Sequence, residues 1–207
     1  MKWRAFVCSA LLGLVLSDAA GWASGAENKA GAESVATAGA LPGDSLYQLP
    51  VTLTTAEGAT LKLSDLRGEP LVVTMFYTHC TSVCPLLTTQ LQRLMSRLPP
   101  AAQHQAHVLM VSFDSVRDTP EVLRAFKSEH HIKDANWLIA RASSSDVRAL
   151  AAALGIQFRE LEDHSYSHSA VISVTDRAGT VRSRTSHLSG TDEAFVHAIQ
   201  AQIANGR

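Results

Sequence analysis

Two cysteines are separated by three residues in the segment FYTHCTSVCPLL, residues 76–87, and a proline follows the second one. Cys80 and Cys84 could form a redox-active pair, hold a metal ion or be buried without reacting, because thiolate sulfur serves both disulfide exchange and metal ligation. Pro85 suits the first turn of a helix and disfavours helical geometry at the residue before it. We therefore expect residues 80–84 to form a loop that leads into a helix N-terminus, where the helix dipole stabilises a thiolate.

Two interpretations in which the cysteines have no reactive or metal-binding role fit this segment less well. The loop position and the exported compartment that the N-terminal residues indicate argue against inert thiols in the core. A purely structural disulfide between Cys80 and Cys84 would close a very small loop, for which the entropic stabilisation is smallest. The pair is therefore interpreted as functional, either in thiol-disulfide exchange or in metal binding.

The residues around the cysteines predict a strand followed by a helix. Residues 71–77, LVVTMFY, form a continuous apolar run that is typical of a strand buried on both faces. After the cysteines, leucines recur at helical spacing at positions 87, 91, 94 and 98, and Pro99 and Pro100 end this pattern. The cysteines are thus expected between the C-terminal end of a strand and the start of a helix.

The rest of the chain repeats this alternation. The expected strands are residues 107–114, 136–140, 169–176 and 180–187, and the expected helices are residues 119–130, 143–155 and 191–205. A β-hairpin with Glu57 and Gly58 near its turn precedes them. This order predicts an α/β sandwich with a mixed central sheet, in which the working site lies beyond the carboxyl ends of the strands.

Composition and charge limit the partners of this chain. It has 207 residues, with 18 Lys and Arg against 19 Asp and Glu, and we find no block of like charge. One domain with a core of its own is expected, and neither nucleic acid nor an anionic membrane surface is indicated as a partner. A small ligand or another protein is the expected partner.

The N-terminal residues predict export. Lys2 and Arg4 precede an apolar run at residues 5–16, and small residues follow it, which is the layout of a secretory signal. The expected organisation is a signal peptide or membrane anchor at residues 1–26, a flexible linker at 27–45 and the folded domain at 46–207. The protein is expected to be periplasmic, with membrane contact only through its N-terminus.

The positions of proline and histidine favour a metal site. Thioredoxin-type redox enzymes generally pair their cysteines with a cis-proline before a later strand, whereas all seven prolines of this chain lie at or before Pro120. The corresponding segment, EDHSYSHSAV, carries histidine instead. Two thiolates and an imidazole form a soft, three-coordinate site that suits Cu(I) better than Mg²⁺ or Ca²⁺. Zinc also binds such ligands, but a structural zinc site needs a fourth protein ligand, and the sequence indicates none.

Three motifs resemble those of the Sco (SenC) family, copper-handling, thioredoxin-like proteins that serve cytochrome c oxidase assembly. They are FYTHCTSVCP at residues 76–85, DSVRDTPEVLRAF at 114–126 and SHSAVISVTDRAG at 167–179, in the family's order. The resemblance implies a thioredoxin-like three-layer sandwich with a mixed central sheet and an N-terminal β-hairpin. It also implies that the family's copper ligands fall on Cys80, Cys84 and His168.

The chain departs from the family pattern at two places. Thr81 and Ser82 stand where the family commonly has Pro-Asp, and Ser167 stands where it commonly has Asp before the ligand histidine. The loss of two local carboxylates is expected to affect copper(II) affinity, the rigidity of the cysteine loop or docking to the oxidase. The identity of the client therefore stays open.

The remaining histidines have simpler interpretations. His79 is expected to point away from the sulfurs and to organise the loop. His164 is the one rival to His168, which is preferred because it directly enters the expected strand, as the motif requires. The other histidines are interpreted as helix-end or surface residues: His104, His107, His130, His131, His187 and His197.

The second motif carries three charged residues near the expected site. Asp114, Arg117 and Asp118 could line the mouth of the site or contact a partner. Asp118 could equally assist the helix cap at Thr119.

The resulting hypothesis is a copper metallochaperone, not a conventional enzyme. It would bind copper through Cys80, Cys84 and His168 and pass it by ligand exchange to the binuclear copper site of cytochrome c oxidase or to another exported copper protein. Two alternatives stay open. Cys80 and Cys84 could be the redox pair of a thiol-disulfide oxidoreductase that keeps client cysteines reduced, with a redox partner of its own, or the protein could sense copper or redox state through protein contacts.

Overall fold

The computed structural model describes residues 40–80 and 83–205. The expected signal or anchor and most of the expected linker lie outside these ranges, so the predicted domain boundaries stay predictions. Within the described ranges, no helix is both long and apolar enough to cross a membrane.

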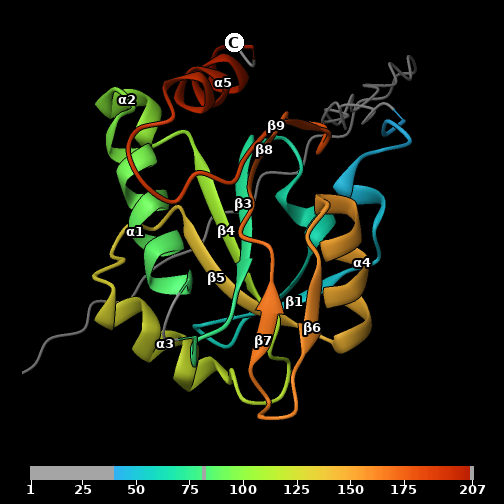
Figure 1. The fold of residues 1–207 in the computed structure, drawn as a ribbon. Coiled ribbons are helices and arrows are strands. Elements are labelled where there is room, and N and C mark those ends of the chain that lie inside the picture. Colours follow the sequence, from blue (N-terminus) through green and yellow to red (C-terminus); the bar gives the residue numbers. More distant parts are fainter. Residues whose placement is uncertain (1–39, 81–82, 206–207) are drawn as a thin grey trace, which may run out of the picture. The chain divides into compact units, whose positions relative to one another are not determined.

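In the described part of the chain, a seven-stranded mixed sheet forms the centre of the fold (Figure 1). Its strands are β1 (Thr52–Thr55), β2 (Thr60–Lys62), β3 (Leu71–Phe76), β4 (His107–Ser112), β5 (Trp137–Ala142), β8 (Ile172–Thr175) and β9 (Val181–Thr185). They lie in the order β2-β1-β5-β4-β3-β8-β9. The pairs β3–β4 and β4–β5 are parallel, and the other neighbours are antiparallel. The expected mixed sheet and the N-terminal hairpin β1–β2 are thus confirmed.

Helices cover both faces of this sheet. They are α1 (Val83–Ser96), α2 (Pro100–Gln103), α3 (Pro120–Glu129), α4 (Ser144–Leu154) and α5 (Glu193–Ala204). Helices α1 and α3 connect neighbouring parallel strands, and right-handed crossovers place both on one face. Figure 1 shows α1 and α3 on one side of the sheet and α4 on the other, which is the three-layer sandwich expected from the sequence.

The hydrophobic core fixes the segment that carries the cysteines. All six residues of β3 are buried. From α1, the side chains of Leu87, Leu91 and Leu94 are 0% exposed, and burying each leucine contributes roughly 1.5–3 kcal/mol. Because β3 and α1 are both anchored in this core, the residues between them are held at its edge.

Helix α1 begins earlier than the sequence indicates. It starts at Val83, so Cys84 and Pro85 both lie in its first turn. Proline is compatible with this position because the first N–H groups of a helix have no intrahelical acceptor. The expectation that Cys84 lies in a loop is therefore wrong, and its side chain projects from a helix.

A second, two-stranded sheet lies apart from the main one. Strand β6 (Phe158–Glu160) pairs antiparallel with β7 (Tyr166–His168), and Phe158 lies opposite His168. From the sequence, a polar loop is expected here, followed by a strand from residue 169. His168 instead ends β7, and β8 begins at Ile172.

Near the start of the described chain, residues 45–47 pack against the turn between β8 and β9 and form hydrogen bonds with it. The buried Ser45 hydroxyl donates to the carbonyl of Ala178, and the N–H of Leu46 donates to the carbonyl of Gly179 at 3.0 Å. Gly179 has a φ of +84°, and a Cβ added to it would lie 2.6 Å from Cδ2 of Tyr47. Both its backbone conformation and its packing therefore exclude a side chain at this position.

Gly179→Ala should destabilise the protein more than Gly190→Ala. Both glycines have positive φ, +84° and +70°, so both changes carry a conformational cost of roughly 1–2 kcal/mol. Only Gly179→Ala adds a clash with Tyr47, since a Cβ on Gly190 meets nothing within 4 Å, and overpacking typically costs a further ~1–3 kcal/mol. Urea denaturation measures both free energies of unfolding, and equal losses would contradict the packing described for Tyr47.

Candidate metal centre

Three side chains able to bind a metal meet near the C-terminal end of β3. Cys80 follows β3, Cys84 lies in the first turn of α1 and His168 ends β7. Their ligand atoms all lie within 4.8 Å of one another, and Sγ of Cys84 is 3.6 Å from Nε2 of His168. The fold thus brings together the three residues that the resemblance singles out.

The two sulfurs are shielded from water. Cys84 is 1% exposed and Cys80 is 7% exposed, and neither forms a disulfide. The rings of Tyr77 and Phe113 flank His168, with 6.0 and 5.0 Å between ring centroids. Such an apolar surround limits the access of solvent to a metal and lowers the local dielectric constant.

His168 presents Nε2 to the sulfurs. Its Nδ1 lies 3.2 Å from the carbonyl oxygen of Ser169, and a carbonyl accepts a hydrogen bond only from a protonated nitrogen. This contact assigns the proton to Nδ1 and directs the lone pair of Nε2 toward Cys84. Neutral imidazole in this tautomer is the form that ligates metal ions.

The two thiols differ in their electrostatic environment. The backbone N–H of Cys84 donates to Sγ of Cys80 at 3.3 Å, so the start of α1 favours negative charge on the Cys80 sulfur. Burial, in contrast, raises the pKa of the Cys84 thiol well above its usual range. The expectation of a thiolate stabilised by the helix N-terminus therefore fits Cys80 and not Cys84.

This set of donors suits a soft metal ion. Thiolate and imidazole ligands select Cu(I) or zinc rather than Mg²⁺ or Ca²⁺. Bonds of about 2.0–2.3 Å from one ion to sulfur and nitrogen match donor atoms that lie within 4.8 Å of one another. Among the described residues, no fourth His, Cys, Asp or Glu belongs to this group, so it lacks the closed ligand set of a structural zinc site.

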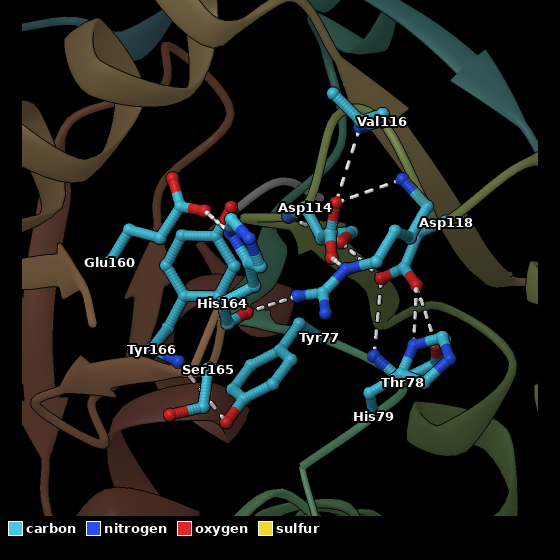
Figure 2. Close-up of polar contacts among 12 residues, drawn as sticks. Tyr77, Thr78, His79, Asp114, Val116, Asp118, Glu160, His164, Ser165 and Tyr166 are labelled. Atoms are coloured by element: carbon cyan, nitrogen blue, oxygen red, sulfur yellow. Dashed lines mark hydrogen bonds and ion pairs between the residues drawn. The ribbon is translucent and has the colours of Figure 1, made fainter. Parts of the chain in front are cut away.

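The buried carboxylate of Asp118 organises the segment before Cys80. It accepts hydrogen bonds from the N–H of Thr78 at 3.1 Å and from the hydroxyls of Thr78 and Ser112. The imidazole of His79 turns to the same carboxylate, with Nδ1 3.9 Å from it (Figure 2). Asp118 therefore holds the chain two residues before Cys80, while the hydroxyl of the next residue caps α3.

A second group of possible ligands comprises His79, Asp114 and Asp118. The carboxylate of Asp114 already accepts hydrogen bonds from the backbone N–H groups of Val116 and Arg117 and forms an ion pair with the guanidinium of Arg117. Because protein donors occupy both carboxylates, we interpret this group as a structural network.

The histidine that lies near the sulfurs is His168 and not His164. The side chain of His164 is 76% exposed, and its Nδ1 lies 2.9 Å from the carboxylate of Glu160. The backbone carbonyl of His164 accepts a hydrogen bond from the guanidinium of Arg117. Arg117 therefore contacts the β6–β7 hairpin at its turn, at the opposite end of β7 from His168.

The sequence pattern predicts neither the β6–β7 hairpin nor the aromatic side chains that pack around His168. The ring of Phe113 lies 4.9 Å from that of Phe158 and 6.2 Å from that of Tyr166, measured between centroids. Each strand has only three residues, and only β7 alternates ring and polar side chains, at Tyr166, Ser167 and His168, so the period of two is a weak signal for the hairpin. These rings pack β6 and β7 against the end of β4.

Comparison with known proteins relates the whole described fold to one family. A family model described as SCO1/SenC matches residues 40–204. A Stutzerimonas stutzeri protein described as "Putative copper-binding protein" is 27% identical over 121 residues, which are 56% of this chain and 58% of that protein. The SCO1 protein homolog of Bacillus subtilis (strain 168) is 25% identical over 103 residues, 49% of this chain and 53% of that protein. The chain thus aligns with little more than half the length of these curated relatives.

A solved structure shares the fold. The crystal structure of a "putative electron transfer protein" from Aquifex aeolicus VF5 superposes with a TM-score of 0.69 and 25% sequence identity. The superposition covers 79% of this chain and 95% of that chain. The two proteins therefore share the architecture over nearly all of the solved chain.

Alkylation of the Cys84 thiol by iodoacetamide should be slow near neutral pH. Only the thiolate attacks, and because burial raises the pKa of Cys84, its reactive fraction should rise about tenfold per pH unit from about pH 7 to pH 10. Mass spectrometry of reduced, metal-free protein gives the rate at each pH, with protein unfolded in guanidinium as the control. A rate that levels off near pH ~8.5 in folded protein, as for an ordinary thiol, would argue against the raised pKa.

Proposed function

Since this chain belongs to the SCO1/SenC family, we propose that it is a copper metallochaperone. It binds one copper ion through Cys80, Cys84 and His168 and delivers it to the binuclear copper site of cytochrome c oxidase or to another exported copper protein. The observation that carries the proposal is the meeting of two buried sulfurs and one imidazole nitrogen within 4.8 Å.

The same geometry provides a route for delivery by ligand exchange. His168 is partly exposed, whereas both cysteines are buried. A ligand from a client therefore reaches the ion on the side of His168, and three protein ligands leave a coordination position for it. Replacing His168 first leaves the ion on the two sulfurs, from which the client's own cysteines then take it.

Similarity to known proteins supports copper as the cargo. One relative is described as a copper-binding protein and is 27% identical to this chain over 121 residues. The role in oxidase assembly rests on the family resemblance of the three motifs. Export rests on the predicted signal at residues 1–26, and the protein would then act in the periplasm.

One contact favours thiol-disulfide exchange as a second function. The N–H of Cys84 donates to Sγ of Cys80 at 3.3 Å, and the two cysteines are not joined by a disulfide. A Cys80 thiolate could attack a client disulfide to form a mixed disulfide, and Cys84 could then displace the reduced client and close a Cys80–Cys84 disulfide. This reaction requires the two sulfurs but not His168.

His168→Ala should weaken copper retention while His164→Ala leaves it unchanged. The first change removes a ligand, and since loss of a residue that merely supports a ligand costs 10–100-fold in affinity, we expect a loss of at least about 100-fold. The second removes an exposed imidazole paired with Glu160. Competition with a chromogenic Cu(I) chelator measures both affinities. If His164→Ala loses copper and His168→Ala does not, the assignment of the ligands is wrong.

Oxidase assembly in cells at low copper separates delivery from thiol exchange. Cys80→Ser and Cys84→Ser should abolish assembly under either function, because both functions need the two sulfurs. His168→Ala should abolish it only if copper is delivered, provided that its thiols still oxidise and reduce normally. If His168→Ala supports normal assembly while both cysteine variants fail, the protein acts by thiol-disulfide exchange and not by copper delivery.

A further inference from the structure

The strand that carries His168 is attached to the rest of the protein by few polar contacts. Strands β6 and β7 pair only with each other in the described chain, outside the main sheet. Two hydrogen bonds join this hairpin to the loops at the ends of β3 and β4. In the first, the N–H of Tyr166 donates to the hydroxyl of Tyr77 at 3.3 Å, and in the second the guanidinium of Arg117 donates to the carbonyl of His164. The position of His168 therefore depends on a small number of identifiable groups.

Arg117 bridges this hairpin and a rigid anchor. Its Nε forms an ion pair with Asp114, while another nitrogen of the same planar group donates to the carbonyl of His164. In Figure 2, dashed lines at Asp114 and His164 mark these two contacts. Asp114 is 2% exposed and also accepts from the N–H groups of Val116 and Arg117 at 3.2 and 2.9 Å. Because the guanidinium is a fixed fork, the ion pair on one side orients the donor on the other.

The same anchor also holds the thiol side of the site. The hydroxyl of Ser112 accepts from the N–H of Asp114 at 2.9 Å and donates to the buried carboxylate of Asp118. Asp118 in turn accepts from the N–H and the hydroxyl of Thr78, two residues before Cys80. The loop after β4 therefore forms hydrogen bonds both with the segment before Cys80 and with the β6–β7 hairpin.

We propose that Arg117 is a positioning residue that straps the β6–β7 hairpin to the loop after β4 and so keeps His168 in reach of the two sulfurs. The proposal rests on the proposed function, since it treats His168 as a ligand of the copper ion. Without the strap, the hairpin moves more freely and the ion spends more time on two sulfurs alone. Arg117 thereby sets the rate at which the cargo leaves the site.

The test uses Arg117→Met, which keeps the apolar stem and removes the fork. The matched control is Arg148→Met. Arg148 is an exposed arginine of α4 that lines the same surface cavity as Arg117, and its side chain makes no hydrogen bond or ion pair within the described residues. The first measurement is amide hydrogen exchange of the reduced, metal-free protein. Arg117→Met should speed exchange in residues 158–168 about tenfold, the size expected for the loss of one hydrogen bond to a charged group, and leave β3 and β4 unchanged.

The second measurement uses protein loaded with Cu(I). Release to a chelator should be about tenfold faster in Arg117→Met, and X-ray absorption should show a weaker nitrogen contribution beside an unchanged pair of sulfurs. Arg148→Met should match the unmutated protein in both experiments. Thermal denaturation checks that the overall stability of each variant is preserved.

The outcomes separate this proposal from the proposed function. Unchanged exchange in the hairpin of Arg117→Met would overturn the strap, and so would faster exchange spread over β3 and β4, which reports general destabilisation. If faster exchange is confined to the hairpin but copper release and the nitrogen signal are unchanged, Arg117 does not position His168 as a ligand. If the unmutated protein binds no Cu(I) while the hairpin of the variant still loosens, the proposed function fails and the strap stands.

Discussion

The 3.6 Å contact between Sγ of Cys84 and Nε2 of His168 joins residues that are 84 positions apart in the chain. One of these groups comes from the start of a core helix, and the other comes from a hairpin outside the main sheet. Nothing local holds such a distance, so each partner must be fixed independently. The leucines of α1 anchor Cys84 in the hydrophobic core, whereas polar contacts of the hairpin and the flanking rings of Tyr77 and Phe113 hold His168. Different interactions therefore hold the two sides of the site: apolar packing holds Cys84, and polar and ring contacts hold the hairpin of His168.

The buried carboxylates of Asp114 and Asp118 accept hydrogen bonds that hold the loops around the site. Asp114 and Asp118 are 2% and 0% exposed, and burying a charge is costly unless it is paired or hydrogen-bonded. Asp114 is compensated by Arg117 and by backbone N–H groups, and Asp118 by three donors from Thr78 and Ser112. Removing every donor of either carboxylate would leave a buried charge without compensation, but Asp114 keeps the backbone N–H donors of residues 116 and 117 when the guanidinium of Arg117 is removed. The network connects three segments at the edge of the sheet, namely the loop after β3, the loop after β4 and the turn between β6 and β7.

The two cysteines divide the demands of the site between them. The helix N-terminus favours negative charge on Cys80, while burial disfavours it on Cys84 by raising the pKa of that thiol. The Cys84 sulfur is thus protected in the metal-free protein, and a metal ion must replace its proton to bind. The pair therefore combines Cys80, whose sulfur is favoured as a thiolate, with Cys84, whose thiol loses its proton only to a strongly bound metal ion or in a reaction. Both copper handling and disulfide exchange can use this difference.

Local periodicity, helix caps and contiguous motifs are enough to predict the alternation of strands and helices, the mixed sheet, the N-terminal hairpin and the family. The family motifs also single out Cys80, Cys84 and His168. The position of Cys84 inside α1, the separate hairpin that ends at His168 and the contact of Asp118 with Thr78 depend on how distant segments pack in three dimensions. The short strands β6 and β7 gave too few residues for a clear period. The partners of Asp114, Arg117 and Asp118 come from segments far apart in the chain. Such contacts depend on how elements pack, which no local pattern encodes.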